Sequence, residues 1–138
     1  MTRLHLSRTH SRRDDGSASL EIAILGPALL LLVFAVVQAG LWFYARSLAL
    51  AAAQEGVAAA GAYEAPGDGG VARARSFLDR SAGDSLQAAA VSTAGSTATT
   101  VRVEVRGRAL SVLPGVPGLP VSQAAQAPVE RFTVGGGP

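Results

Sequence analysis

A chain of 138 residues is large enough for one small domain, and the absence of cysteine excludes a disulfide framework and any thiolate metal site. The formal net charge of +2 is too small to indicate nucleic-acid binding, because arginines alternate with acids along most of the chain.

The chain begins with a basic leader, residues 1–16, whose arginines are Arg3, Arg8, Arg12 and Arg13. The leader ends in Gly16, and Glu21 follows directly before a long apolar run. This arrangement resembles that of type IV prepilins, in which a membrane peptidase cuts after a glycine and leaves a glutamate at the fifth mature position. The matching cut would fall between Gly16 and Ser17.

Glu21 has a physical argument of its own. A carboxylate at the lip of a bilayer segment is costly unless it is paired. The new amine of Ser17, in the same or a neighbouring subunit, would be a suitable partner after cleavage. The competing interpretation is a solvated acid that the helix dipole favours, with Ser17 or Ser19 as a helix cap.

Residues 22–44 carry no charge, and Gln38 is their only strongly polar side chain. As a helix they would span roughly 34 Å, against ~30 Å of bilayer hydrocarbon. Trp42 and Tyr44 are expected in the headgroup layer, and Arg46 would extend into it. The arginine-rich leader predicts a cytoplasmic N-terminus and an extracytoplasmic C-terminal domain. The alternative is a buried core helix of a soluble protein.

Two features within this segment bear on its role. Pro27, preceded by Gly26, removes one backbone hydrogen bond and is expected to bend or loosen the helix. Val37-Gln38-Ala39 before Gly40 offers small residues to a secretory signal peptidase. Release of a soluble domain by that enzyme is therefore a competing interpretation.

The chain resembles the TadE-like family of minor pseudopilins from tight-adherence pilus systems. Three segments carry the resemblance: Gly16–Pro27, the membrane exit Gln38–Arg46, and Ala51–Ala58 with its Glu55-Gly56 pair. Gln54 and Val57 stand where the family often has basic residues. The resemblance implies a single-pass assembly component of a pilus or secretion system. Its implied partners are membrane lipid, a prepilin peptidase and other pilus or pseudopilin subunits.

Beyond the membrane, residues 47–62 favour a helix that continues as a stalk, so residues 17–62 form one transmembrane and stalk helix. Small residues along it permit close contact with its own domain or with other subunits. Residues 64–70 predict a turn, and residues 71–79 a second helix. A short extra helical turn is expected over residues 85–90.

The composition shifts to Val, Thr and Ser from Ala89, which favours strands. Residues 100–106 alternate, so that Val101, Val103 and Val105 would face a core and the charged residues between them would face water. Residues 113–120 predict a rigid apolar loop, and residues 121–134 a returning strand with Pro128 at a sheet edge. The predicted fold is α+β: residues 63–134 form a small antiparallel sheet on one or two helices, before a tail at 135–138.

The exported part would lack His, Cys and Lys, because His5 and His10 lie in the leader. This excludes Ser-His, Cys-His and Ser-Lys catalysis and the usual zinc ligands. We therefore expect no enzyme, cofactor, metal site or small-molecule substrate, and we interpret Asp79 and Asp84 as surface charges. The remaining functions are a minor pseudopilin, a membrane-tethered binding module that does not polymerise, or a secreted small domain.

Overall fold

The computed structural model describes residues 13–62 and 68–129. The chain divides into two compact units, Met1–Ala35 and Val36–Pro138. The first helix, α1 (Arg13–Gly61), contributes to both. The second unit also contains α2 (Gly69–Ser81) and a sheet of three strands.

The C-terminal part of α1 is a core element of the second unit. Its buried side chains recur every three or four residues, which places them on one helix face. Those residues are Ala45, Leu48, Ala49, Ala52, Ala53 and Val57. The predicted stalk is thus helical, and its small residues pack against the chain's own domain.

The second helix begins two residues before the predicted start, at Gly69, and buries Ala74 and Leu78. It crosses α1 closely, because two glycines meet at the contact. A Cβ on Gly56 would lie 2.8 Å from the carbonyl oxygen of Gly70, and a Cβ on Gly70 would lie 2.7 Å from the Cβ of Ala60. Neither position has room for a side chain.

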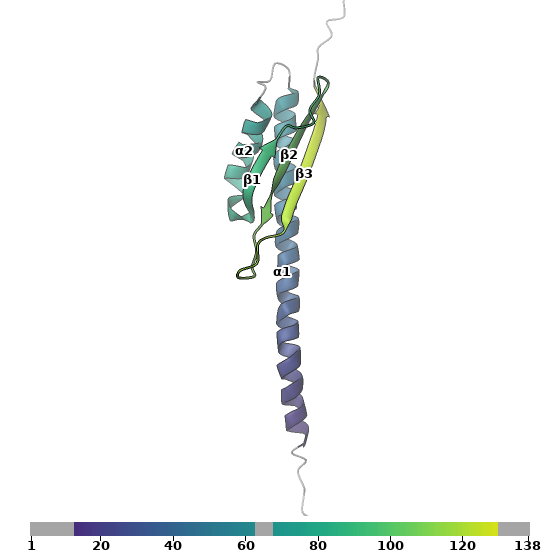
Figure 1. Ribbon diagram of the computed structural model, residues 1–138, viewed down its shortest axis with the longest axis vertical. Coiled ribbons are helices and arrows are strands. Elements are labelled where there is room, and N and C mark those ends of the chain that lie inside the picture. The colour runs from purple at the N-terminus through teal and green to yellow at the C-terminus, as the bar shows by residue number, and fades with distance from the viewer. Residues whose placement is uncertain (1–12, 63–67, 130–138) are drawn as a thin grey trace, which may run out of the picture. The chain divides into compact units, whose positions relative to one another are not determined.

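The sheet consists of β1 (Leu86–Ser92), β2 (Thr100–Ala109) and β3 (Pro120–Pro128), antiparallel and in that order. One face of the sheet covers α2 and the C-terminal part of α1 (Figure 1). The predicted α+β class is therefore confirmed. Pro120 is the first residue of β3 and Pro128 the last, in an edge strand, as expected for residues that cannot donate to a central ladder.

The alternation in β2 correctly predicts its core face. Val103 and Val105 are fully buried, and Val101 packs against the same cluster. The charged residues between them lie on the outer face, although Glu104 is only 14% exposed. Their neighbours on β2 and β3 cover it, which alternation alone does not reveal.

The predicted helical turn over residues 85–90 is wrong. A 3₁₀ turn occupies Gly83–Ser85, and Leu86 opens β1. Leu86 pairs with Ala109 and is buried, so tertiary pairing overrides the helical preference of Leu-Gln-Ala-Ala. An irregularity follows between Gln87 and Ala90, where Ala88 adopts a φ of 50°.

Candidate functional site

The N-terminal part of α1 is apolar and exposed. Within the helix from Ser19 to Gly61, an 18-residue window has a mean hydropathy of 2.6, and none of that window is buried. The length and composition of this helix therefore suit a membrane span. The side chains concerned include Leu20, Ile22, Ile24, Leu25, Leu29, Leu30, Leu31, Leu32, Val33 and Val36. Such a surface in a globular protein would be covered by other apolar groups, and none of the described residues of the first unit covers it.

The residues of the predicted processing site begin this helix. The backbone of Gly16 and Ser17 is helical within α1, while their side chains lie outside what the structure describes. The leader arginines Arg3, Arg8 and Arg12, together with His5 and His10, also lie outside the described residues. Cleavage after Gly16 therefore stays a prediction.

Glu21 and Pro27 lie in the described part of α1. The side chain of Glu21 is exposed, and no ion pair within the described residues includes it. The helix continues through Pro27. An open apolar groove lies beside this proline, lined by Ile22, Leu25, Gly26, Ala28, Leu29 and Leu32. The assembly roles of Glu21 and Pro27 stay predictions.

In the second unit, Gln38 joins α1 to the connection between β2 and β3. Its Nε2 donates to the carbonyl oxygen of Leu110 at 3.1 Å, and its Oε1 accepts from the N–H of Val112 at 3.1 Å. Sequence reasoning noticed Gln38 only as a polar exception. A lone amide in an apolar helix signals that a partner exists, but the partner lies more than seventy residues away in the chain.

The three residues predicted at the membrane interface follow on the same helix. Trp42 donates its indole N–H to the carbonyl oxygen of Pro120 at 3.1 Å, and the guanidinium of Arg46 lies 5.6 Å from the Trp42 ring centroid. Tyr44 is 52% exposed and Phe43 59% exposed. The hydrogen bond of Trp42 thus links α1 to β3, whereas the rings of Phe43 and Tyr44 are exposed. Contact of these residues with lipid stays a prediction.

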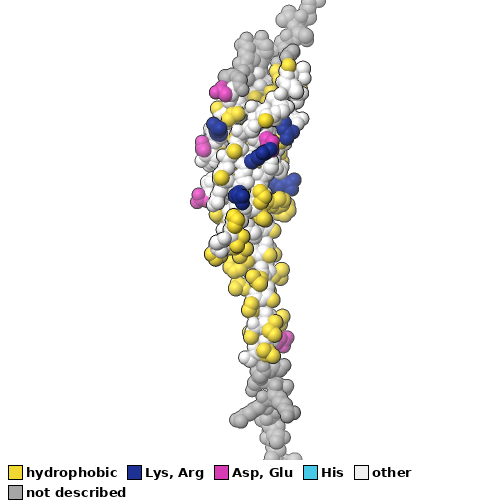
Figure 2. Space-filling model, viewed as in Figure 1, with side chains coloured by type: hydrophobic (Ala, Val, Ile, Leu, Met, Phe, Trp, Pro, Cys, Tyr) yellow, Lys and Arg dark blue, Asp and Glu magenta, His cyan; other side chains and the backbone are white. Residues whose placement is uncertain are grey.

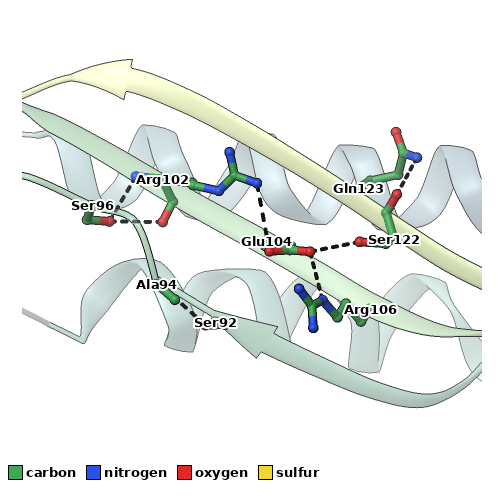
Figure 3. A network of polar contacts seen from close by, with 8 residues as sticks. All are labelled: Ser92, Ala94, Ser96, Arg102, Glu104, Arg106, Ser122 and Gln123. Carbon is green, nitrogen blue, oxygen red and sulfur yellow. Dashed lines mark hydrogen bonds and ion pairs between the residues drawn. The ribbon is translucent and has the colours of Figure 1, made fainter.

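Most of the charged side chains visible in the second unit lie over the sheet and α2 (Figure 2). On the outer face of the sheet, Glu104 accepts from Arg106 Nε at 2.7 Å and from the Ser122 hydroxyl at 2.8 Å, and Arg102 lies 3.8 Å away (Figure 3). Hydrogen bonds from Arg106 and Ser122 lower the pKa of Glu104, partly opposed by desolvation. The hydrogen bond with Glu104 in turn raises the pKa of Arg106. This cluster stabilises the strand pair and offers no proton donor near neutral pH.

Acid is expected to weaken the Glu104 cluster. A carboxyl whose folded pKa is depressed stabilises the fold fully above its unfolded pKa, and this contribution is lost as the pH falls through the folded pKa. We expect the melting temperature to fall more steeply below about pH 4.5 in the wild type than in Glu104→Gln. The difference should be small, because Arg106 is largely open to solvent. Melting temperatures are measured on the detergent-solubilised proteins. If those of the wild type and of Glu104→Gln fall equally as the pH is lowered, this role is contradicted.

Comparisons with known proteins bear on the N-terminal half of the chain. Residues 16–58 match the model of a protein family described as TadE-like protein. No curated protein and no solved structure matches. The match includes the predicted processing site, the apolar helix and the Glu55-Gly56 pair, and it ends before α2 and the sheet. The predicted resemblance is confirmed over these residues. With the apolar helix, it supports a pilus-related membrane protein.

Proposed function

From the TadE-like character of residues 16–58, we propose that this chain is a minor pseudopilin, a single-pass membrane component that takes part in assembling a tight-adherence-type pilus or secretion system. The observation that carries the proposal is the family match over a helix whose N-terminal apolar window is exposed, with Gly16 and Glu21 near its start. Its partners are membrane lipid, a prepilin peptidase and other pilus or pseudopilin subunits.

The N-terminal segment supports a processing step. A prepilin peptidase would cut between Gly16 and Ser17 and remove the basic leader. Glu21 would then lie near the start of the mature helix, with its carboxylate exposed and unpaired within the described part of the chain. A carboxylate in that position is costly unless it is paired, and the Ser17 amine of the same or a neighbouring subunit would be its partner.

The charge pattern supports one orientation. Four arginines precede the apolar helix, whereas Arg46 is the first basic residue after it. The N-terminus would therefore remain in the cytoplasm, and α2 and the sheet would lie on the other side of the membrane, in the cell envelope. Pro27 and the apolar groove beside it would provide a contact surface for another helix once the chain leaves the bilayer for an assembly.

The contacts of Gln38 disfavour the secreted-domain alternative. Cleavage after Ala39 would remove Gln38 from the second unit and leave the groups at Leu110 and Val112 without the partners they have now. It would also cut α1 within a continuous helical stretch, three residues before Trp42. A domain released there would lose part of its own fold.

Complementation in the native host tests the assembly function. We expect a strain that lacks this gene to make few or no surface pili, as counted by electron microscopy, and the wild-type gene to restore them. Immunoblots of the membrane fraction confirm that each protein is present. Normal piliation in the deletion strain would contradict the proposal and favour a membrane-tethered binding module that does not polymerise.

A further inference from the structure

The connection between β2 and β3, residues 110–119, is an apolar segment of the second unit with exposed side chains. No charged residue occurs from Ala109 to Val129. The side chain of Val116, in the turn at the tip, is 51% exposed, and that of Leu119, at the base of the loop, is 48% exposed. We call residues 110–119 the β2–β3 loop. Contiguous exposed apolar patches mark contacts with another surface more often than single exposed side chains do.

This loop has a defined conformation. Pro114 and Gly115 occupy the centre of a turn that the N–H of Val116 closes onto the carbonyl of Leu113 at 3.2 Å, and Gly115 has the positive φ of 75° that a type II turn requires. At the base, Ala109 N–H donates to the carbonyl of Leu119 at 2.9 Å. A Cβ on Gly118 would overlap the carbonyl oxygen of Ala109, so only glycine fits there.

Several polar backbone groups of the loop are hydrogen-bonded within the protein. Gln38 binds the carbonyl of Leu110 and the N–H of Val112, and the Ser111 hydroxyl accepts from the N–H of Leu113. Arg108 donates to the carbonyl of Gly118 at 3.2 Å. Pro114 and Pro117 have no N–H to satisfy. These bonds and the two prolines reduce the number of polar groups that must lose water when the loop approaches a less polar medium.

Gln38, which binds the β2–β3 loop, stands in the sequence near the expected outer end of the membrane span. From Ile22 to Val37 the helix rises about 24 Å, which is short of the ~30 Å of a bilayer hydrocarbon core. The span thus needs about four more residues, which are Gln38 to Leu41. Gln38, whose side chain binds the β2–β3 loop, is one of these residues, and the exposed rings of Phe43 and Tyr44 follow it in the chain.

We propose that the β2–β3 loop is a second membrane-binding site of this chain, and that its partner is the lipid surface around the outer end of the membrane helix. Val116 and Leu119 would enter the boundary between headgroups and acyl chains, where exposed aromatic rings are also favoured. Gln38 couples the loop to the helix. The proposal rests on the membrane location of α1 and adds a contact that fixes how the sheet meets the bilayer.

Environment-sensitive labels test this contact directly, because the chain has no native cysteine. Full-length Val116→Cys carrying a nitrobenzoxadiazole label is reconstituted into phosphatidylcholine vesicles with and without brominated acyl chains. The matched label is Ala94→Cys, in the connection between β1 and β2. A label at Leu31→Cys reports whether the helix spans the bilayer. It thereby distinguishes a helix that does not insert from a loop that does not contact lipid.

We expect emission from residue 116 to be blue-shifted and quenched by brominated lipid, with residue 94 remaining water-like. A water-like signal at 116 while residue 31 is quenched would overturn the loop site and leave the membrane helix intact. A signal at 116 that appears only at high protein-to-lipid ratio would also overturn it, because another copy of the chain would then cover the loop.

A substitution provides the second arm. Val116→Asp places a charge on an exposed tip without touching the core, so the protein should fold, as judged by an unchanged Trp42 emission spectrum. With the label at Leu119→Cys, we expect brominated lipid to quench its fluorescence several-fold less in the Val116→Asp background than with Val116 present. Quenching of a label at Leu31→Cys should be the same in both backgrounds. Equal quenching in both backgrounds would contradict insertion of the loop.

Discussion

The Gly56→Ala variant is expected to lose about 1–3 kcal/mol of the free energy of unfolding of the second unit, the usual effect of forcing extra volume into a packed contact. A Cβ there would lie 2.8 Å from the carbonyl oxygen of Gly70, 3.0 Å from Cγ1 of Val103 and 3.1 Å from Cβ of Ala74. The nearest of these atoms is backbone, so α1 and α2 must separate. Denaturant unfolding in detergent, followed by the fluorescence of the single tryptophan, measures the loss.

Gly40→Ala is the matched control in the same helix. A Cβ at Gly40 would meet nothing within 4 Å. Alanine is favoured over glycine in a helix interior by roughly 0.5–1 kcal/mol, so this variant should be neutral or more stable. Equal shifts in the two variants would contradict the close crossing of α1 and α2 at Gly56.

The Glu21→Ala variant is expected to abolish assembly while leaving membrane insertion unchanged. Glu21 is exposed on α1 and forms no ion pair within the described residues, so its removal disturbs no contact that the structure shows in the chain itself. In an assembly, the variant would remove the acceptor for a neighbouring subunit's amine. Surface pili in the complemented deletion strain, together with the amount of protein in the membrane fraction, measure the two effects.

Glu55→Ala is the control for this loss of an acid. Glu55 pairs with Arg73 at 2.8 Å across α1 and α2, and both side chains are about half exposed. Such a pair contributes at most about 1 kcal/mol, so the variant should fold and still support assembly. Normal piliation with Glu21→Ala would show that Glu21 does not set subunit register.

Local patterns in the sequence predict much of this fold. Strict alternation identifies Val103 and Val105 as core residues, because a strand places every second side chain on the same face. Pro128 correctly marks an edge strand. A charge-free run predicts an exposed apolar helix, and Gly16 and Glu21 before it lead to the resemblance that the family match confirms.

The features that the sequence does not reveal depend on distant partners. Leu86 belongs to a strand because it pairs with Ala109, against the helical preference of its neighbours. Gly70 looks like a turn residue until α2 is seen crossing α1 at Gly56. Gln38 looks like a polar exception in a membrane segment until the β2–β3 loop supplies both of its partners. Nothing near these residues in the chain specifies those contacts.

The N-terminal residue and intact mass of the mature protein test the pseudopilin proposal most directly. The protein is made together with a prepilin peptidase and purified from the membrane fraction, with Gly16→Leu as the variant in which cleavage should fail. The proposal predicts Ser17 at the N-terminus of the wild type and Met1 at that of the variant. Gly40 at the N-terminus, with the protein in the medium, would contradict it, as would an intact leader in the wild type while the peptidase processes a known prepilin.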